Sequence, residues 1–161
     1  MERLLSKMME FNAGDPQQIQ HFIKVHSFAR LIGLGESLDE RTQNILEVAA
    51  IVHDIGIKPA LEKHGTGAGP YQELEGPPVA EKMLEELRYA PEVIERVCYL
   101  VGHHHTYRDI DGMDYQILVE ADFLVNMYEG EMSADAIRAT LHNIFRTKTG
   151  IRYCQLMFQA L

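Results

Sequence analysis

The residues best suited to chemistry are the adjacent pair His53 and Asp54, which stand where an apolar segment runs out into Gly56. A carboxylate buried beside an imidazole is costly to desolvate without a partner, and a divalent metal is one such partner. Neutral imidazole and carboxylate together suit zinc, iron, manganese or nickel. The pair also fits a simpler interpretation, a core histidine hydrogen-bonded to a capping aspartate, so the choice depends on ligands elsewhere in the chain.

Further candidate ligands stand in other apolar segments. His26 lies among apolar residues of a predicted helix, where it fits either a ligand or a packed core histidine. Three successive histidines, 103–105, follow an apolar helix, and two of them can converge although neighbours on a helix are about 100° apart. This cluster indicates metal or phosphate contacts. Asp122 follows Ala121 in a segment that otherwise reads as core, so its charge needs a partner.

The remaining histidines have no comparable neighbours and are predicted to be ordinary surface or packing residues: His21, His64 and His142.

Helical periodicity organises the elements that must position these residues. Apolar residues recur at helical spacing over 2–11, about 16–34 and 114–128, and Ser37 with Glu40 has the spacing of a capping box before the helix that carries His53. No segment shows sustained alternation of apolar and polar residues. The sequence therefore predicts an all-α, single-domain protein over 1–161, with about six or seven helices.

The segment 58–78 is rich in glycine and proline and is predicted to be a long surface loop, with Pro77 and Pro78 starting the next helix. A loop of this length beside a site is a common place for a substrate lid. Lys58 within it could meet a phosphate. Glu75 precedes the next helix, where its carboxylate either favours the helix N-terminus or reaches a metal.

Composition limits the classes of function. The chain of 161 residues has a formal net charge of −9, which disfavours binding to nucleic-acid polymers, although a metal can attract a small anionic substrate locally. No apolar run is long enough to cross a membrane, and the first residues do not resemble a secretory signal. With two cysteines that lack metal-type spacing, these features predict a cytoplasmic protein. The methionine-rich first helix is suited to a homodimer contact.

Taken together, the candidate residues resemble the HD superfamily of metal-dependent phosphohydrolases. The resemblance covers about residues 20–128, and C-terminal helices over 133–161 are expected to pack on this core. It rests on four short motifs: Val25-His26-Ser27-Phe28-Ala29-Arg30, His53-Asp54-Ile55-Gly56, Gly102-His103-His104 and Glu120-Ala121-Asp122.

The resemblance implies an orthogonal helical bundle in which four side chains bind one divalent transition metal ion, namely His26, His53, Asp54 and Asp122. The ion would be iron, manganese, nickel, zinc or cobalt. In family members with a second ion, extra ligands come from histidines placed like His103 and His104. These family members have one further histidine ligand, and this chain has Glu75 at the corresponding position. The chain departs from nucleotidase-like members at Ile57, where they carry glutamate, and it lacks the Gly-Tyr-Pro element of cyclic-dinucleotide phosphodiesterases.

The expected activity is hydrolysis of a small phosphate ester, such as a nucleotide, by a metal-activated water. His53 and Asp54 would be catalytic, and Arg30, Lys58 and His104 are the expected contacts to the substrate. Two alternatives remain open: a di-iron oxygenase with the same ligands, and a nucleotide-sensing module without turnover.

Overall fold

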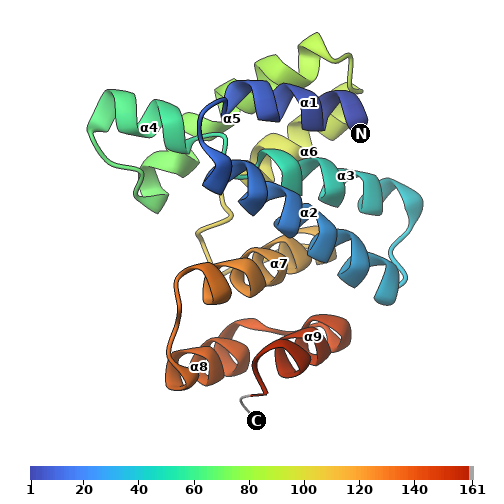
Figure 1. The fold of residues 1–161 in the computed structure, drawn as a ribbon. Helices are drawn as coiled ribbons and strands as arrows, with labels where there is room; N and C mark the ends of the chain where they lie inside the picture. The colour runs from blue at the N-terminus through green and yellow to red at the C-terminus, as the bar shows by residue number, and fades with distance from the viewer. Residues whose placement is uncertain (160–161) are drawn as a thin grey trace.

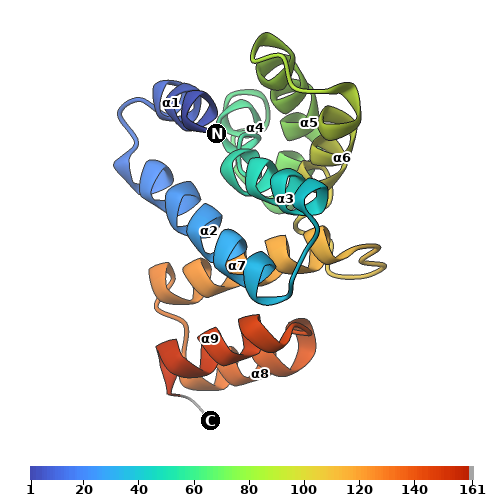
Figure 2. The same cartoon turned by 90° about the vertical axis from the view of Figure 1, so that its right-hand side faces the viewer.

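A computed structural model describes residues 1–159, and the described chain is entirely helical (Figures 1 and 2). Its nine helices within these residues are α1 (Glu2–Phe11), α2 (Pro16–Gly35), α3 (Glu40–Val52), α4 (Ile57–His64), α5 (Gly69–Glu86), α6 (Pro91–Val101), α7 (Met113–Glu129), α8 (Ala134–Ile144) and α9 (Lys148–Phe158). The prediction of an all-α fold is confirmed. The number of helices exceeds the six or seven expected.

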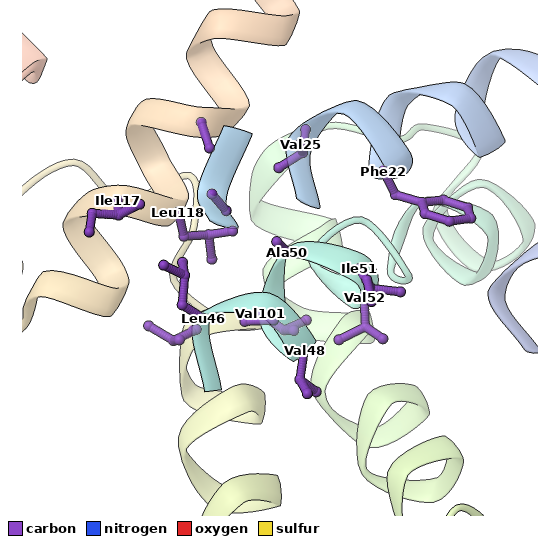
Figure 3. Packing of buried hydrophobic residues seen from close by; sticks show 14 of the residues in the cluster. Phe22, Val25, Leu46, Val48, Ala50, Ile51, Val52, Val101, Ile117 and Leu118 are labelled. Carbon is purple, nitrogen blue, oxygen red and sulfur yellow. The ribbon is translucent and has the colours of Figure 1, made fainter. Parts of the chain in front are cut away.

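Helix α3 forms the centre of the fold and packs against α1, α2, α6 and α7. Every residue from Ile45 to Val52 is buried, including the unbroken apolar run from Val48 onward. A helix that is apolar on all sides is stable only when other helices surround it. Figure 3 shows side chains of α2, α6 and α7, among them Phe22, Val101 and Leu118, converging on this helix. Because α3 ends at Val52, its last turn delivers His53 and Asp54 to the middle of the bundle.

The start of α3 differs from the expected capping box. Asp39 is the N-cap and accepts hydrogen bonds from the backbone N–H of Thr42 at 3.0 Å and from its hydroxyl at 2.6 Å. Ser37 instead adopts a left-handed conformation, with φ of 59°, in the turn that follows α2. Aspartate caps as well as serine does, so the helix begins at Glu40, directly after this cap.

The segment 58–78 is not the predicted loop, because α4 and the first half of α5 occupy most of it. Gly65 ends α4 in a left-handed conformation, and Pro70 lies in the first turn of α5. Pro77 and Pro78 lie inside α5 instead of starting it. Proline has no N–H to donate to the carbonyl one turn earlier, so two helical hydrogen bonds are missing here. The helix nevertheless extends from Gly69 before these prolines to Glu86 after them. The sequence interpretation treated these prolines as a helix start, which is wrong.

The other helices cover the ends of the bundle. Helices α4, α5 and α6 pack in series on one side of α3, and the α8–α9 pair lies against α7, with α9 also touching α2 (Figures 1 and 2). Leu4 and Met8 of α1 are buried, so the apolar face of that helix is covered within the chain. None of the described helices combines the length and the apolar character that a membrane crossing requires.

Candidate metal centre

Three mutually packed helices bring four polar side chains to one buried point. His21 comes from the second turn of α2, His53 and Asp54 follow α3, and Asp122 lies in α7. His53 is completely buried, and His21 and Asp122 are each only 5% exposed. So many ionisable groups in a helical core are costly unless they are paired or bind a cation.

Short distances link the two imidazoles of this group to each other and to both carboxylates. The Nε2 atom of His21 lies 3.3 Å from Nε2 of His53 and 3.2 Å from Oδ1 of Asp122. The Oδ2 atom of Asp54 lies 3.4 Å from His21 Nε2 and 3.5 Å from His53 Nε2, and Asp122 Oδ1 lies 3.4 Å from His53 Nε2. His21, His53 and Asp54 therefore form a group that could hold a metal ion, and Asp122 Oδ1 lies beside both imidazoles of that group.

Hydrogen bonds at Nδ1 determine which nitrogen of the His53 and His104 rings carries the hydrogen. Nδ1 of His53 lies 2.9 Å from the carbonyl oxygen of Ala50, and Nδ1 of His104 lies 2.8 Å from that of Val101. A carbonyl only accepts, so each Nδ1 must carry the proton, and in the neutral ring Nε2 then presents a lone pair. These lone pairs face carboxylate oxygens, and His104 Nε2 has no hydrogen-bond partner at all among the described residues. The donor set therefore suits a bound cation, which such inward-facing nitrogens and oxygens ligate.

The electrostatics of the centre agree with this need for positive charge. Burial lowers the pKa of His21, but the hydrogen bond and charge of Asp122, the charge of Asp54 and the contact with Glu129 outweigh burial and raise it to about 9. The pKa of His53 is also raised, because Asp54 and Asp122 outweigh its burial. The pKa of Asp54 is held well below its usual range, because the nearby histidines outweigh its burial. Protons or a metal ion can supply the positive charge that the two carboxylates require.

A second group of potential ligands shares Asp54 with the first. It consists of Asp54, His104 and His105, with Nε2 of His104 3.4 Å from Oδ1 of Asp54. His105 lies beside His104, with ring centroids 4.0 Å apart, and its Nε2 is 3.1 Å from Oε1 of Gln72. Burial and the charge of His104 lower the pKa of His105 to about 4, so His105 is neutral and able to coordinate.

The third histidine of the cluster lies apart from both groups. Nδ1 of His103 is 2.7 Å from the carbonyl oxygen of Tyr99, and its ring stacks on the Tyr99 ring with centroids 4.2 Å apart. Of the two histidines predicted to hold a second ion, the structure therefore places His104 at the centre and His103 outside it. His105 joins His104 instead.

The structure does not bring His26 to the centre. It lies five residues after His21 on α2, which turns it by about 140° around the helix axis. Its Nε2 is 3.3 Å from Oε2 of Glu47, whose Oε1 also accepts a hydrogen bond from Arg30 at 2.8 Å. His26 and Arg30 thus belong to a polar contact between α2 and α3, and His21 takes the position expected for His26.

A sequence signal for His21 existed, although the interpretation above missed it. His21 shares one face of α2 with Val25, Ala29 and Ile32, all completely buried, at spacings of four, four and three residues. His26 lies on a different face, together with Arg30. Both histidines have apolar neighbours in the sequence. They differ in that His21, and not His26, is on the face of α2 that carries the completely buried residues.

Two other predicted site residues are engaged elsewhere. Glu75 accepts hydrogen bonds from Lys63 and from Nε2 of His64, the latter at 2.9 Å, and these contacts lower its pKa. Lys58 reaches the carbonyl oxygen of Phe11 at 3.4 Å and lies over the Phe11 ring. Neither side chain is part of the two ligand groups found among residues 1–159.

Outer partners orient the centre. Gln18 donates from Nε2 to Oδ2 of Asp54 at 2.9 Å, and Glu129 Oε2 lies 2.7 Å from Nδ1 of His21. The other oxygen of Glu129 accepts from Lys24 at 2.5 Å. A carboxylate on the far nitrogen of a ligating histidine fixes the ring and makes its free nitrogen more basic. Sequence reasoning identified neither Gln18 nor Glu129.

We expect Glu129→Ala to weaken metal binding by about 10- to 100-fold, because His21 loses the partner that orients its ring. Titration with Zn²⁺ against a chromophoric chelator measures this change. Glu131→Ala is the matched control, since Glu131 is exposed, lies two residues away and makes no side-chain hydrogen bond or ion pair within residues 1–159. Equal dissociation constants for the two variants would show that Glu129 does not support the centre.

Comparison with known proteins places the chain in a family. The HD domain family model matches residues 19–147. The fold is similar to that of a solved structure described as a predicted HD superfamily hydrolase from an uncultured Thermotogales bacterium. The TM-score is 0.70 at 21% sequence identity, over 99% of this chain and 85% of that one. A search of curated proteins gave no match. The chain belongs to the HD domain family.

Proposed function

We propose that the protein is a metal-dependent phosphohydrolase that hydrolyses a small phosphate ester, such as a nucleotide. The observation that carries the proposal is the set of lone pairs at the centre. Nε2 of His21 and His53 faces oxygens of Asp54 and Asp122 at 3.2–3.5 Å, in a site with almost no exposure. Such an arrangement is stable with a cation in its middle and is repulsive when its histidines are neutral and the middle is empty.

The donor set fits a divalent transition metal ion, namely iron, manganese, nickel, zinc or cobalt. Two neutral imidazoles and two carboxylates bring the charge of such an ion close to zero while leaving positions for other ligands. When bound, the ion lowers the pKa of a water molecule and polarises a phosphoryl oxygen. The second group, with His104 and His105, is the proposed place for a second ion.

The side chains around the centre have separate tasks in this proposal. Asp54 belongs to both ligand groups, so it fixes their relative position, and Gln18 restrains its Oδ2. His104 keeps an unpartnered Nε2 beside Oδ1 of Asp54, where it can accept a proton or a second cation. Tyr115 holds the histidine-bearing turn, since its hydroxyl contacts the carbonyl oxygens of His103 and Thr106.

Two of the three substrate contacts expected from the sequence are not part of this proposal. Arg30 is paired with Glu47 and Lys58 lies on Phe11, so neither is proposed to bind substrate. His104 remains a proposed contact. The free thiols Cys98 and Cys154 fit a reducing compartment, and we propose the cytoplasm as the site of action.

The experiment is a metal-reconstitution assay on the untagged protein. The protein is stripped with a chelator, loaded separately with each of the five metals, and assayed with p-nitrophenyl phosphate and a panel of nucleotides. We expect phosphate release with at least one metal and none from the stripped protein. Full metal occupancy without release from any of these substrates would contradict a phosphohydrolase.

A further inference from the structure

A pocket opens directly beside the metal centre. It has a volume of about 370 Å³ and is lined by His105, Thr106, Tyr107 and Arg108 of the α6–α7 connection. His105 also belongs to the second ligand group with Asp54 and His104, so the pocket and the centre share a wall. Figure 2 shows this connection projecting beyond the start of α7. A substrate whose reacting phosphate lies at the centre would extend into this pocket.

The backbone of the pocket is anchored on two sides. Glu73 of α5 accepts hydrogen bonds from the N–H of His105 at 2.9 Å and from the hydroxyl of Thr106 at 3.1 Å. Tyr115 of α7 holds the carbonyl oxygens of His103 and Thr106. The pocket is therefore preformed at residues 105 and 106, which reduces the ordering cost of binding a ligand there.

The ring of Tyr107 connects the pocket to the centre. It packs against Phe123, the neighbour of Asp122, with centroids 5.0 Å apart. Its hydroxyl lies 3.5 Å from Nδ1 of His105. Burial and the charges of Asp122, Glu73 and Asp54 raise its pKa to about 12, so the hydroxyl stays protonated and neutral.

Arg108 differs from several other basic side chains of the protein in having no acidic partner among the described residues. Those side chains are each paired with a carboxylate: Lys24 with Glu129, Arg30 with Glu47, Lys63 with Glu75, and Arg96 with Asp111 and Asp114. No ion pair or hydrogen bond engages the exposed guanidinium of Arg108 within residues 1–159. In a chain with a net charge of −9, an unpaired guanidinium at the wall of the site provides local attraction for an anion.

We infer that Arg108 determines substrate specificity by binding a second anionic group, carried on the leaving part of the phosphate ester. This inference rests on the proposed function, because the reacting phosphate occupies the metal centre. Arg108 stands three positions after His105, so their Cα atoms are at most about 10 Å apart in an extended chain. Nucleoside bisphosphates carry two phosphates within such a distance, and the exposed ring of Tyr107 offers a surface to their sugar or base.

The test compares adenosine 5′-monophosphate with adenosine 3′,5′-bisphosphate on the metal-loaded protein. We expect Arg108→Ala to raise KM for the bisphosphate by about 10- to 100-fold, the usual effect of losing a hydrogen-bonded charge pair. Its kcat for the bisphosphate and its kinetics with the monophosphate should change less than about twofold. The matched control is Arg41→Ala, an exposed arginine about 18 Å along α3 from His53. An equal change for both nucleotides, or no change, would overturn the inference.

Calorimetric binding of the bisphosphate separates this inference from the proposed function. If the wild-type protein hydrolyses neither nucleotide, the proposed function fails for this class of substrate, while binding still reports on Arg108. At least 10-fold weaker binding by Arg108→Ala than by Arg41→Ala would support the anion site. Equal binding by the two variants would overturn it.

Discussion

His21→Ala is expected to lose metal binding by more than about 100-fold and to lose phosphatase activity with it. Removal of an outer partner of a ligating histidine already costs about 10- to 100-fold in affinity, so removal of the ligand itself should cost more. His21 Nε2 lies within 3.4 Å of atoms from His53, Asp54 and Asp122, which makes it part of the centre and not merely a neighbour. Metal per protein, measured by elemental analysis after dialysis, gives the result directly.

His26→Ala is the matched control, because it removes the same side chain from the same helix five residues later. His26 contacts Glu47 instead of the centre, so this variant should retain its metal and its activity. Loss of metal from His26→Ala with retention in His21→Ala would contradict the arrangement of α2 described here. Circular dichroism of both variants identifies any loss of folding.

Glu120→Ala is expected to reduce the free energy of unfolding by about 3–5 kcal/mol, because it leaves several buried donors without a partner. Glu120 of α7 is completely buried and accepts hydrogen bonds from four donors. These are the side-chain amide of Gln116, the backbone N–H groups of Arg146 and Thr147, and the Thr147 hydroxyl. Thr147 caps α9, so Glu120 fixes the start of α9 to α7.

Urea unfolding of Glu120→Ala and of Glu62→Ala measures the effect. Glu62 is an exposed glutamate of α4, and its replacement should leave the unfolding midpoint nearly unchanged. Midpoints that coincide for the two variants would show that the contacts of Glu120 add nothing to stability.

Much of the helical fold follows from local patterns in the sequence. The bounds of α1 follow from apolar spacing, and Asp15 with Pro16 marks the start of α2, where the Asp15 carboxylate accepts from the N–H of Gln18. The α4–α5 region was predicted incorrectly because proline and glycine favour loops locally. In the folded chain, the packing of α5 on α4 and α6 outweighs that preference at Pro77 and Pro78.

The candidate centre was only partly predictable. His53 and Asp54 are adjacent in sequence, and the apolar surroundings of Asp122 reveal that its charge needs a partner. The choice between His21 and His26 depends on the rotation of α2 about its own axis, which is set by packing on α3 and α7. The same applies to His103 and His105, because the turn after Val101 decides which ring faces Asp54. Family resemblance supplied the residue types but placed one ligand on the wrong face of its helix.

Anomalous X-ray diffraction from crystals of the metal-loaded protein can locate the ion among these side chains. We expect a metal peak in direct contact with Nε2 of His21 and His53 and with the carboxylates of Asp54 and Asp122. A peak at His26, or no peak among these four side chains in fully loaded protein, would contradict this expectation.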